Sequence, residues 1–213
     1  MKYGESSFDI IYLTFALVFG LILIIKHKNR VALLFGIMAL ILGVGDAFHL
    51  IPRVVSYFVG DELILYKGIG KFVTSISMTI FYSLLEFARI RLTNDKRKWP
   101  LISIGALASI RLLLCAFPQN EWLISPSSYL WGIIRNVPFA AIGVITIILW
   151  FNDFRDKSPF KIMWLLVALS FAFYLVTVLG AAYVPMLGMM MLPKTICSML
   201  MIISFYRYNR KEE

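Results

Sequence analysis

Residues 32–57 read ALLFGIMALILGVGDAFHLIPRVVSY, an apolar run interrupted by one acid, one histidine and one arginine, Asp46, His49 and Arg53. A membrane-spanning α-helix needs about 20 mostly apolar residues. A charge near its centre costs roughly 2.5–3.5 kcal/mol on insertion scales, so such charges are usually functional. The stretch therefore predicts a transmembrane helix that carries part of a functional site.

Six further apolar runs resemble this one. The chain has 213 residues, 60% of them hydrophobic, and a mean hydropathy of +0.82, well above that of a water-soluble domain. We predict an all-α, seven-transmembrane-helix bundle formed by residues 1–213 as a single domain. The expected spans lie near 8–25, 32–57, 65–88, 100–117, 128–151, 160–183 and 186–206.

The distribution of charge predicts an orientation. The net charge of +9 comes from Lys and Arg residues in the loops after the first, third and fifth spans and in the C-terminal tail. The opposite connections carry the acids Asp61, Glu62 and Glu121. By the positive-inside rule, the N-terminus is outside and the C-terminus is cytoplasmic, in a multi-pass protein of the cell membrane. This pattern accounts for the basic residues without a nucleic-acid partner.

Further cations interrupt other spans. Lys71, Arg111, Arg135 and Lys194 each lie in a different apolar run, and the rise of about 1.5 Å per residue puts all four in the outer half of the bilayer, as it does Arg53. We expect these five cations to converge on one well-buried acid, Asp46, in a shared outward-facing pocket. The surplus of positive charge favours an anion, such as the phosphate or carboxylate of an amphiphile.

Helical phase adds polar and aromatic neighbours to the same faces of these spans. The expected ligand-binding residues are Arg53, Lys71, Tyr82, Arg111, Arg135, Asn136, Tyr174 and Lys194. The expected partners are membrane lipids and an anionic amphiphile. The alternative is that the charges are structural pairs that lock the bundle, with Glu86 or Glu121 neutralising some of the cations.

Asp46 and His49 are candidate catalytic residues because their i, i+3 spacing lets a carboxylate orient an imidazole. Ser75 and Ser77 are expected to bond back to their own helix, as serines in membrane helices often do. With His27 and His49 as the only histidines, we predict no metal site and no cofactor. Cys115 and Cys197 lie in apolar runs and are expected to be buried thiols.

The segment from Leu42 to Arg53, LGVGDAFHLIPR, resembles the Gly-Asp helix of the YhhN-type lysoplasmalogenase family. The resemblance continues into an aromatic-rich helix, here Tyr66 to Leu85. It implies hydrolysis of the vinyl-ether bond of lysoplasmalogens by membrane-embedded acids, one of which Asp46 would match. Where that family has a second acid late in the chain, this sequence has Ser170.

Three functional classes therefore stay open. The first is a lipid-directed hydrolase or transferase of the lysophospholipid or lysoplasmalogen type. The second is a transporter or receptor for a small anion or an anionic lipid, which needs the same pocket but no chemistry. The third is a retinal protein with Lys194 as the Schiff base, although Arg111 and Arg135 nearby would oppose its protonated form.

Overall fold

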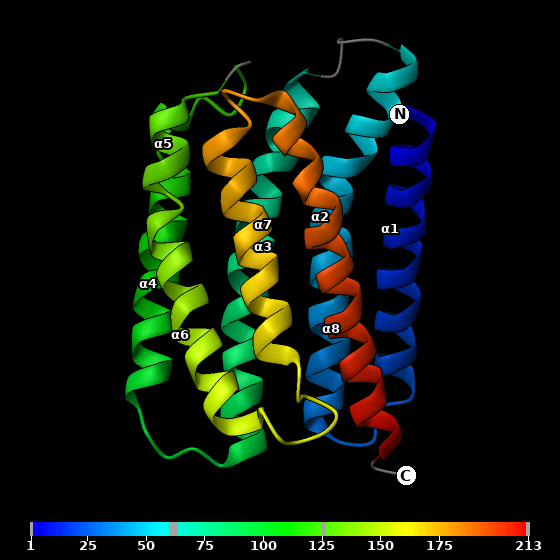
Figure 1. Ribbon diagram of the computed structural model, residues 1–213, viewed down its shortest axis with the longest axis vertical. Helices are drawn as coiled ribbons and strands as arrows, with labels where there is room; N and C mark the ends of the chain where they lie inside the picture. The colour runs from blue at the N-terminus through cyan, green and yellow to red at the C-terminus, as the bar shows by residue number, and fades with distance from the viewer. Residues whose placement is uncertain (1, 60–63, 125–126, 212–213) are drawn as a thin grey trace.

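The computed structural model describes residues 2–59, 64–124 and 127–211, and Figure 1 shows that these form a helical bundle. No strand occurs in the described ranges. The helices are α1 (Lys2–Ile25), α2 (Arg30–Val59), α3 (Ile64–Thr93), α4 (Trp99–Ala116), the 3-10 helix η2 (Pro118–Asn120), α5 (Tyr129–Ile134), α6 (Val137–Phe154), α7 (Met163–Gly180), the 3-10 helix η3 (Pro185–Met190) and α8 (Met191–Lys211).

Among the described residues, seven segments are long and apolar enough to cross a membrane, which agrees with the predicted number of spans. They are Tyr3–Ile25, Arg30–Phe58, Leu65–Thr93, Trp99–Ala116, Tyr129–Phe154, Met163–Gly180 and Pro185–Lys211. The length and composition of these helices indicate a multi-pass membrane protein, and the described fold is all-helical. The N- and C-termini lie at opposite ends of the bundle, which we call the N-terminal end and the C-terminal end (Figure 1).

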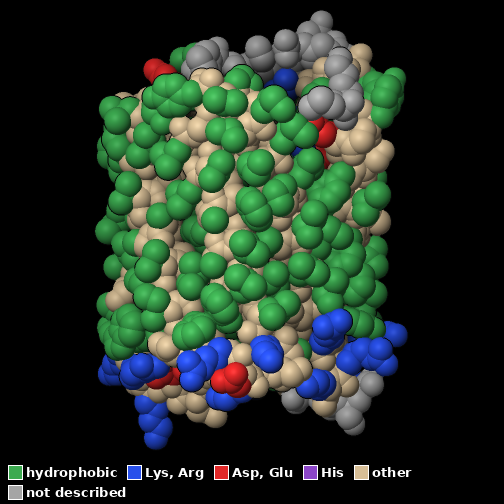
Figure 2. Space-filling model, in the orientation of Figure 1, with side chains coloured by type: hydrophobic (Ala, Val, Ile, Leu, Met, Phe, Trp, Pro, Cys, Tyr) green, Lys and Arg blue, Asp and Glu red, His purple; other side chains and the backbone are tan. Residues whose placement is uncertain are grey.

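Side-chain types divide along the long axis of the bundle. In Figure 2 hydrophobic side chains cover the middle of the visible face, and Lys and Arg side chains gather at the C-terminal end. Two acids expected on the opposite side, Asp61 and Glu62, lie outside the described residues.

Prolines mark the two places where a predicted span is broken. The helix α5 ends at Ile134 and α6 begins at Val137, so Arg135 and Asn136 lie in the break and Pro138 lies in the first turn of α6. Pro193 similarly lies in the first turn of α8, directly after η3. Proline is tolerated in a first helical turn because the missing N–H has no intrahelical acceptor there.

Close contact between α2 and α3 depends on glycine. A methyl group at Gly70 would lie 2.2 Å from the carbonyl oxygen of Phe48 and 2.6 Å from Cα of His49. One at Gly45 would lie 2.4 Å from Cβ of Ser77. Small residues let membrane helices approach closely, so these glycines seat the α2 segment around Asp46 and His49 directly on α3.

The helix α3 extends beyond its predicted end near residue 88, which corrects the placement of Arg89 in a basic loop. Arg89 is fully buried and bonded to three carboxylates. Its guanidinium donates to Glu86 at 2.7–2.9 Å, to Asp95 at 2.8 Å and to Asp153. We call these four residues the Arg89 cluster. The extra helical turn forms because it brings this cation to acids from α3, the following loop and α6.

Candidate functional site

A ladder of polar contacts joins α1 to α2 at the N-terminal end of the bundle. Its three hydrogen bonds are each 2.6 Å long and run from Tyr57 to Glu5, from Arg53 to Asp9 and from Tyr12 to Asp46. The residues are four and three positions apart on α1 and seven and four positions apart on α2, so each set lies on one face of its helix. Glu5, Asp9 and Tyr12 were not predicted as site residues, although their spacing matches one helical face.

Asp9 changes the charge balance expected from the sequence. It is 2% exposed and forms an ion pair with Arg53, whose side chain is 24% exposed. The expectation of a single buried acid, Asp46, is therefore wrong: there is a second on α1. Asp9 was overlooked because it precedes the most apolar part of the first span. Arg53 thus already has a carboxylate partner.

The structure places Asp46 and His49 one turn apart on α2 without a hydrogen bond between them among the described residues. Asp46 is 6% exposed, and its Oδ2 accepts the bond from Tyr12. His49 has a buried Nδ1 with no hydrogen-bond partner. The imidazole interacts electrostatically with three cations, Arg53, Lys71 and Lys194. His49 therefore lies among cations, and Asp46 is hydrogen-bonded to a tyrosine.

Arg111 on α4 is the least satisfied cation in the bundle interior. It is 1% exposed, and its Nε and Nη1 have no hydrogen-bond partner in the described part of the chain. Its Cζ lies 3.3 Å from the centre of the Phe139 ring, and it interacts with the polar groups of Tyr174 and Cys115. A desolvated cation–π contact contributes about 2 kcal/mol, whereas burying an ion costs several kcal/mol. The ring alone does not compensate the charge.

Lys194 on α8 is the second buried cation of this kind. It is 3% exposed, and its Nζ lies 3.6 Å from the sulfur of Met78, a weak acceptor. Within the described ranges, no carboxylate lies within 4.0 Å of Lys194 or of Arg111. These two side chains hold positive charge that the described acids do not neutralise by direct contact.

Arg135, in the break between α5 and α6, is held by neutral groups. Its Nη1 donates to Oδ1 of Asn120 at 2.8 Å, and its Cζ lies 4.2 Å from the centre of the Trp122 ring. Asn120 is fully buried and donates to the carbonyl oxygens of Leu114 and Phe117, at 2.7 and 2.8 Å. Asn120 and Trp122 were missed because a short connection between spans resembles an ordinary turn in sequence.

The remaining predicted residues lie between or beside these cations. Tyr174 donates to Oδ1 of Asn136 at 2.8 Å, and the hydroxyls of Tyr82 and Ser170 lie 3.2 Å apart. The space between Arg111 and Tyr82 is filled by packed aromatic rings, among them Phe139. Aromatic rings therefore occupy the interior between these two predicted residues.

Lys71 differs from the other cations because it is exposed at the surface of the bundle. It interacts electrostatically with Arg135 and Lys67. Ser75 and Ser77 bond back to carbonyl oxygens of α3, as predicted. Cys115 and Cys197 are buried free thiols, also as predicted.

A cavity of about 400 Å³ opens at the N-terminal end, between α1, α2, η3 and α8. One wall is polar, with Glu5, Arg53 and Tyr57, and the other is largely apolar, with methionines such as Met186 and Met189. Of the five predicted cations, Arg53 lines this cavity. Its two walls suit a molecule with a charged group and an apolar tail.

Comparisons with protein family models, with curated proteins and with solved structures found no match to this chain.

Proposed function

We propose that this protein binds an anionic amphiphile at the N-terminal end of its bundle, which faces outward across the cell membrane. The gathering of Lys and Arg at the C-terminal end supports this orientation by the positive-inside rule. The ligand then comes from the outer leaflet. Phosphate or carboxylate is its charged group, because guanidinium and ammonium groups pair best with those anions.

One observation carries the proposal: Arg111 and Lys194 are both at least 97% buried and have no carboxylate within 4.0 Å in the described part of the chain. Two uncompensated cations inside a membrane protein cost far more than packing recovers. An anion bound near them removes that cost. The ligand therefore contributes the negative charge that the described chain does not place there.

The cavity beside Arg53 supports a route for the amphiphile. Its lining includes Met191 and Leu192, and Lys194 follows on the next turn of α8. Methionine side chains are flexible and adapt to apolar ligands of varied shape. We infer that the headgroup passes the ion pair of Arg53 and Asp9 and that the apolar tail stays among the methionines.

Native mass spectrometry of the purified protein with lysophosphatidylglycerol tests this function. Arg111→Gln and Lys194→Gln should each weaken binding about 10- to 100-fold, because each removes a charge-assisted contact of about 1.5–3 kcal/mol. Lys98→Gln, which removes an exposed cation at the C-terminal end, is the matched control and should bind like the wild type. Equal binding by all four proteins would contradict the proposal.

A hydrolase acting on lysophospholipids or lysoplasmalogens is the second candidate. The unpartnered Nδ1 of His49, one turn from the buried carboxylate of Asp46, favours it, because such a nitrogen can take a proton from water. Asp46→Asn should then lower turnover of a lysoplasmalogen by on the order of 100-fold while the lipid still binds. If the wild type shows no turnover and Asp46→Asn changes only affinity or flux, a transporter or receptor is supported instead.

The retinal alternative has its own test. Lys194 is the lysine that a Schiff base would use, and a protonated Schiff base needs a carboxylate counter-ion. The absence of such a group within 4.0 Å among the described residues weighs against this alternative. The retinal alternative would be supported if the protein absorbed visible light after addition of retinal and Lys194→Gln did not.

A further inference from the structure

Two pockets at the C-terminal end of the bundle share a wall. The first, of about 560 Å³, lies between the loop after α1 and the end of α8, and Lys26, Lys28 and Arg210 contribute to its lining. The second, of about 590 Å³, runs along α1 and α8. Tyr206 and Arg210 line both pockets, so the two are adjacent.

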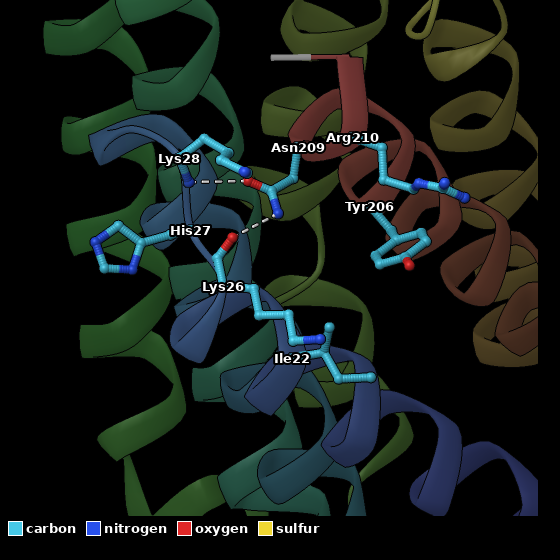
Figure 3. Close-up of a pocket in the computed structure, with 7 residues that line it drawn as sticks. All are labelled: Ile22, Lys26, His27, Lys28, Tyr206, Asn209 and Arg210. Atoms are coloured by element: carbon cyan, nitrogen blue, oxygen red, sulfur yellow. Dashed lines mark hydrogen bonds between the residues drawn. The ribbon is translucent and has the colours of Figure 1, made fainter. Parts of the chain in front are cut away.

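Hydrogen bonds hold the rim of the first pocket in place. Asn209 is 4% exposed; its Oδ1 accepts from the backbone N–H of Lys28 at 3.0 Å, and its Nδ2 donates to the carbonyl oxygen of Lys26 at 2.9 Å. Figure 3 shows both bonds, with Asn209 between the loop and the end of α8. The loop is therefore fixed to α8, and Lys26, Lys28 and Arg210 line the same pocket.

The charge of the combined pocket has one sign. Lysine and arginine side chains from the loop and from α8 line it, and none of the described lining residues is acidic. The exposed cations are Lys26, Lys28, Arg207, Arg210 and Lys211. This grouping is suited to a phosphate.

The second pocket continues from the basic rim into the apolar middle of the bundle surface. Its lining includes Phe15, Phe19 and Ile203. The rings of Phe15 and Phe19 stack with centroids 4.3 Å apart, and Phe19 meets the edge of Tyr206 at 5.3 Å. Phe19 precedes Lys26 by seven residues, which is about 10 Å along a helix axis. The part of the pocket wall formed by Phe19 therefore lies at the depth of the lipid acyl chains when Lys26 is at the headgroups.

We propose that this groove between α1 and α8 is a binding site for an anionic phospholipid of the leaflet at the C-terminal end. The phosphate lies between Lys26 and Arg210, and an acyl chain lies along Phe19 and Phe15. The site is separate from the proposed function, since it lies at the opposite end of the bundle. Basic clusters next to the hydrocarbon boundary attract anionic lipids in general, and the aromatic groove adds a surface for the chain.

The test counts phosphatidylglycerol molecules retained by the purified full chain in native mass spectra, against phosphatidylcholine with the same acyl chains. The double variant Lys26→Gln and Arg210→Gln should bind phosphatidylglycerol about 25-fold more weakly, since each cation near the membrane surface contributes about fivefold. The matched control is Lys96→Gln with Lys98→Gln, which removes two exposed cations of the same end outside both pockets. It should bind like the wild type.

Three results would overturn the proposal. The first is equal retention of phosphatidylglycerol and phosphatidylcholine by the wild type, because it would show that the site does not recognise the anionic headgroup. The second is equal loss in both double variants, because it would show general attraction to the charged end. The third is competition by glycerol 3-phosphate or inorganic phosphate at the same concentration as the lipid. That result would mean that the site recognises a free anion and that the aromatic groove contributes nothing.

Discussion

The two ends of this bundle treat buried positive charge in opposite ways. At the C-terminal end, Arg89 is fully buried and its guanidinium is bonded to Glu86, Asp95 and Asp153. At the N-terminal end, Arg111 is 1% exposed and has the Phe139 ring and the neutral polar groups of Tyr174 and Cys115 instead. A buried cation that is saturated by acids stabilises one fold, whereas one without acids is available to a ligand. The difference separates structural from functional charge in one chain.

The largest expected effect is the loss of Arg89. Arg89→Gln leaves three carboxylates close together without their shared cation, and breaking a buried ion pair from one side costs about 3–5 kcal/mol. Arg111→Gln is the matched variant and should change the free energy of unfolding of the ligand-free protein by less than about 1 kcal/mol, or stabilise it. Reversible unfolding in mixed micelles measures both. Similar losses in the two variants would remove the distinction between the two ends.

The second prediction concerns Tyr12 in the ladder between α1 and α2. Tyr12→Phe removes the donor to the buried Asp46 carboxylate, and a hydrogen bond to a charged group contributes about 1.5–3 kcal/mol. Tyr57→Phe removes the outermost contact of the ladder, to Glu5, and should cost less because Tyr57 is partly exposed. The same unfolding assay applies. A larger loss in Tyr57→Phe would show that the ladder is not anchored at Asp46.

The third prediction tests the close packing that seats the N-terminal site. Gly70→Ala should cost about 1–3 kcal/mol, because the new methyl group meets backbone atoms of Phe48 and His49. Gly105→Ala on α4 is the control: nothing lies within 4 Å of the added carbon, and alanine favours a helix by up to about 1 kcal/mol. Unfolding measurements on both variants are required. If Gly70→Ala leaves the free energy of unfolding unchanged, α2 and α3 must separate easily at this point.

The smallest expected effect is the pH dependence at Asp95, in the loop after α3. Hydrogen bonds from Arg97 and then from Arg89 hold the pKa of Asp95 below its ordinary value of 3.8. Because the folded-state pKa is the lower one, this stabilisation is complete above 3.8 and is lost as the pH falls below it. The stability difference between the wild type and Asp95→Asn should be constant from about pH 5 to 7 and shrink towards about pH 3. A constant difference down to pH 3 would contradict the assignment.

The sequence predicted the spans well because hydropathy and the length of a helix across a bilayer are local properties. Partners were harder to predict. The pairing of Asp9 with Arg53 depends on the register between α1 and α2, which no single span encodes. The sequence placed Arg89 in the basic loop after the third span. Its acid partners come from three separate segments, so the sequence pattern near Arg89 does not reveal them together.

The candidate site was predicted in part. The cations of separate spans lie at one end of the bundle, but packing decided their surroundings: Arg135 is held by Asn120, Arg111 lies on Phe139, and Lys71 is exposed. Helical phase shows which side chains face the interior. It does not distinguish side chains that fill the interior from side chains that surround an open cavity. The aromatic interior between Arg111 and Tyr82 is therefore a property that only the three-dimensional arrangement reveals.

The central claim is that the N-terminal end keeps its buried cations for an anionic ligand, and the unfolding free energy with and without lysophosphatidylglycerol tests it most directly. A ligand that binds the folded state at 100 times its dissociation constant adds about 2.7 kcal/mol. The account predicts that the wild type and Lys98→Gln gain this amount. Without lipid, Arg111→Gln should be within about 1 kcal/mol of the wild type or more stable. Because it binds about 10- to 100-fold more weakly, it should gain only about 0.4–1.4 kcal/mol at the same lipid concentration. An Arg111→Gln protein that is unstable without lipid yet gains as much from it as the wild type would contradict the claim.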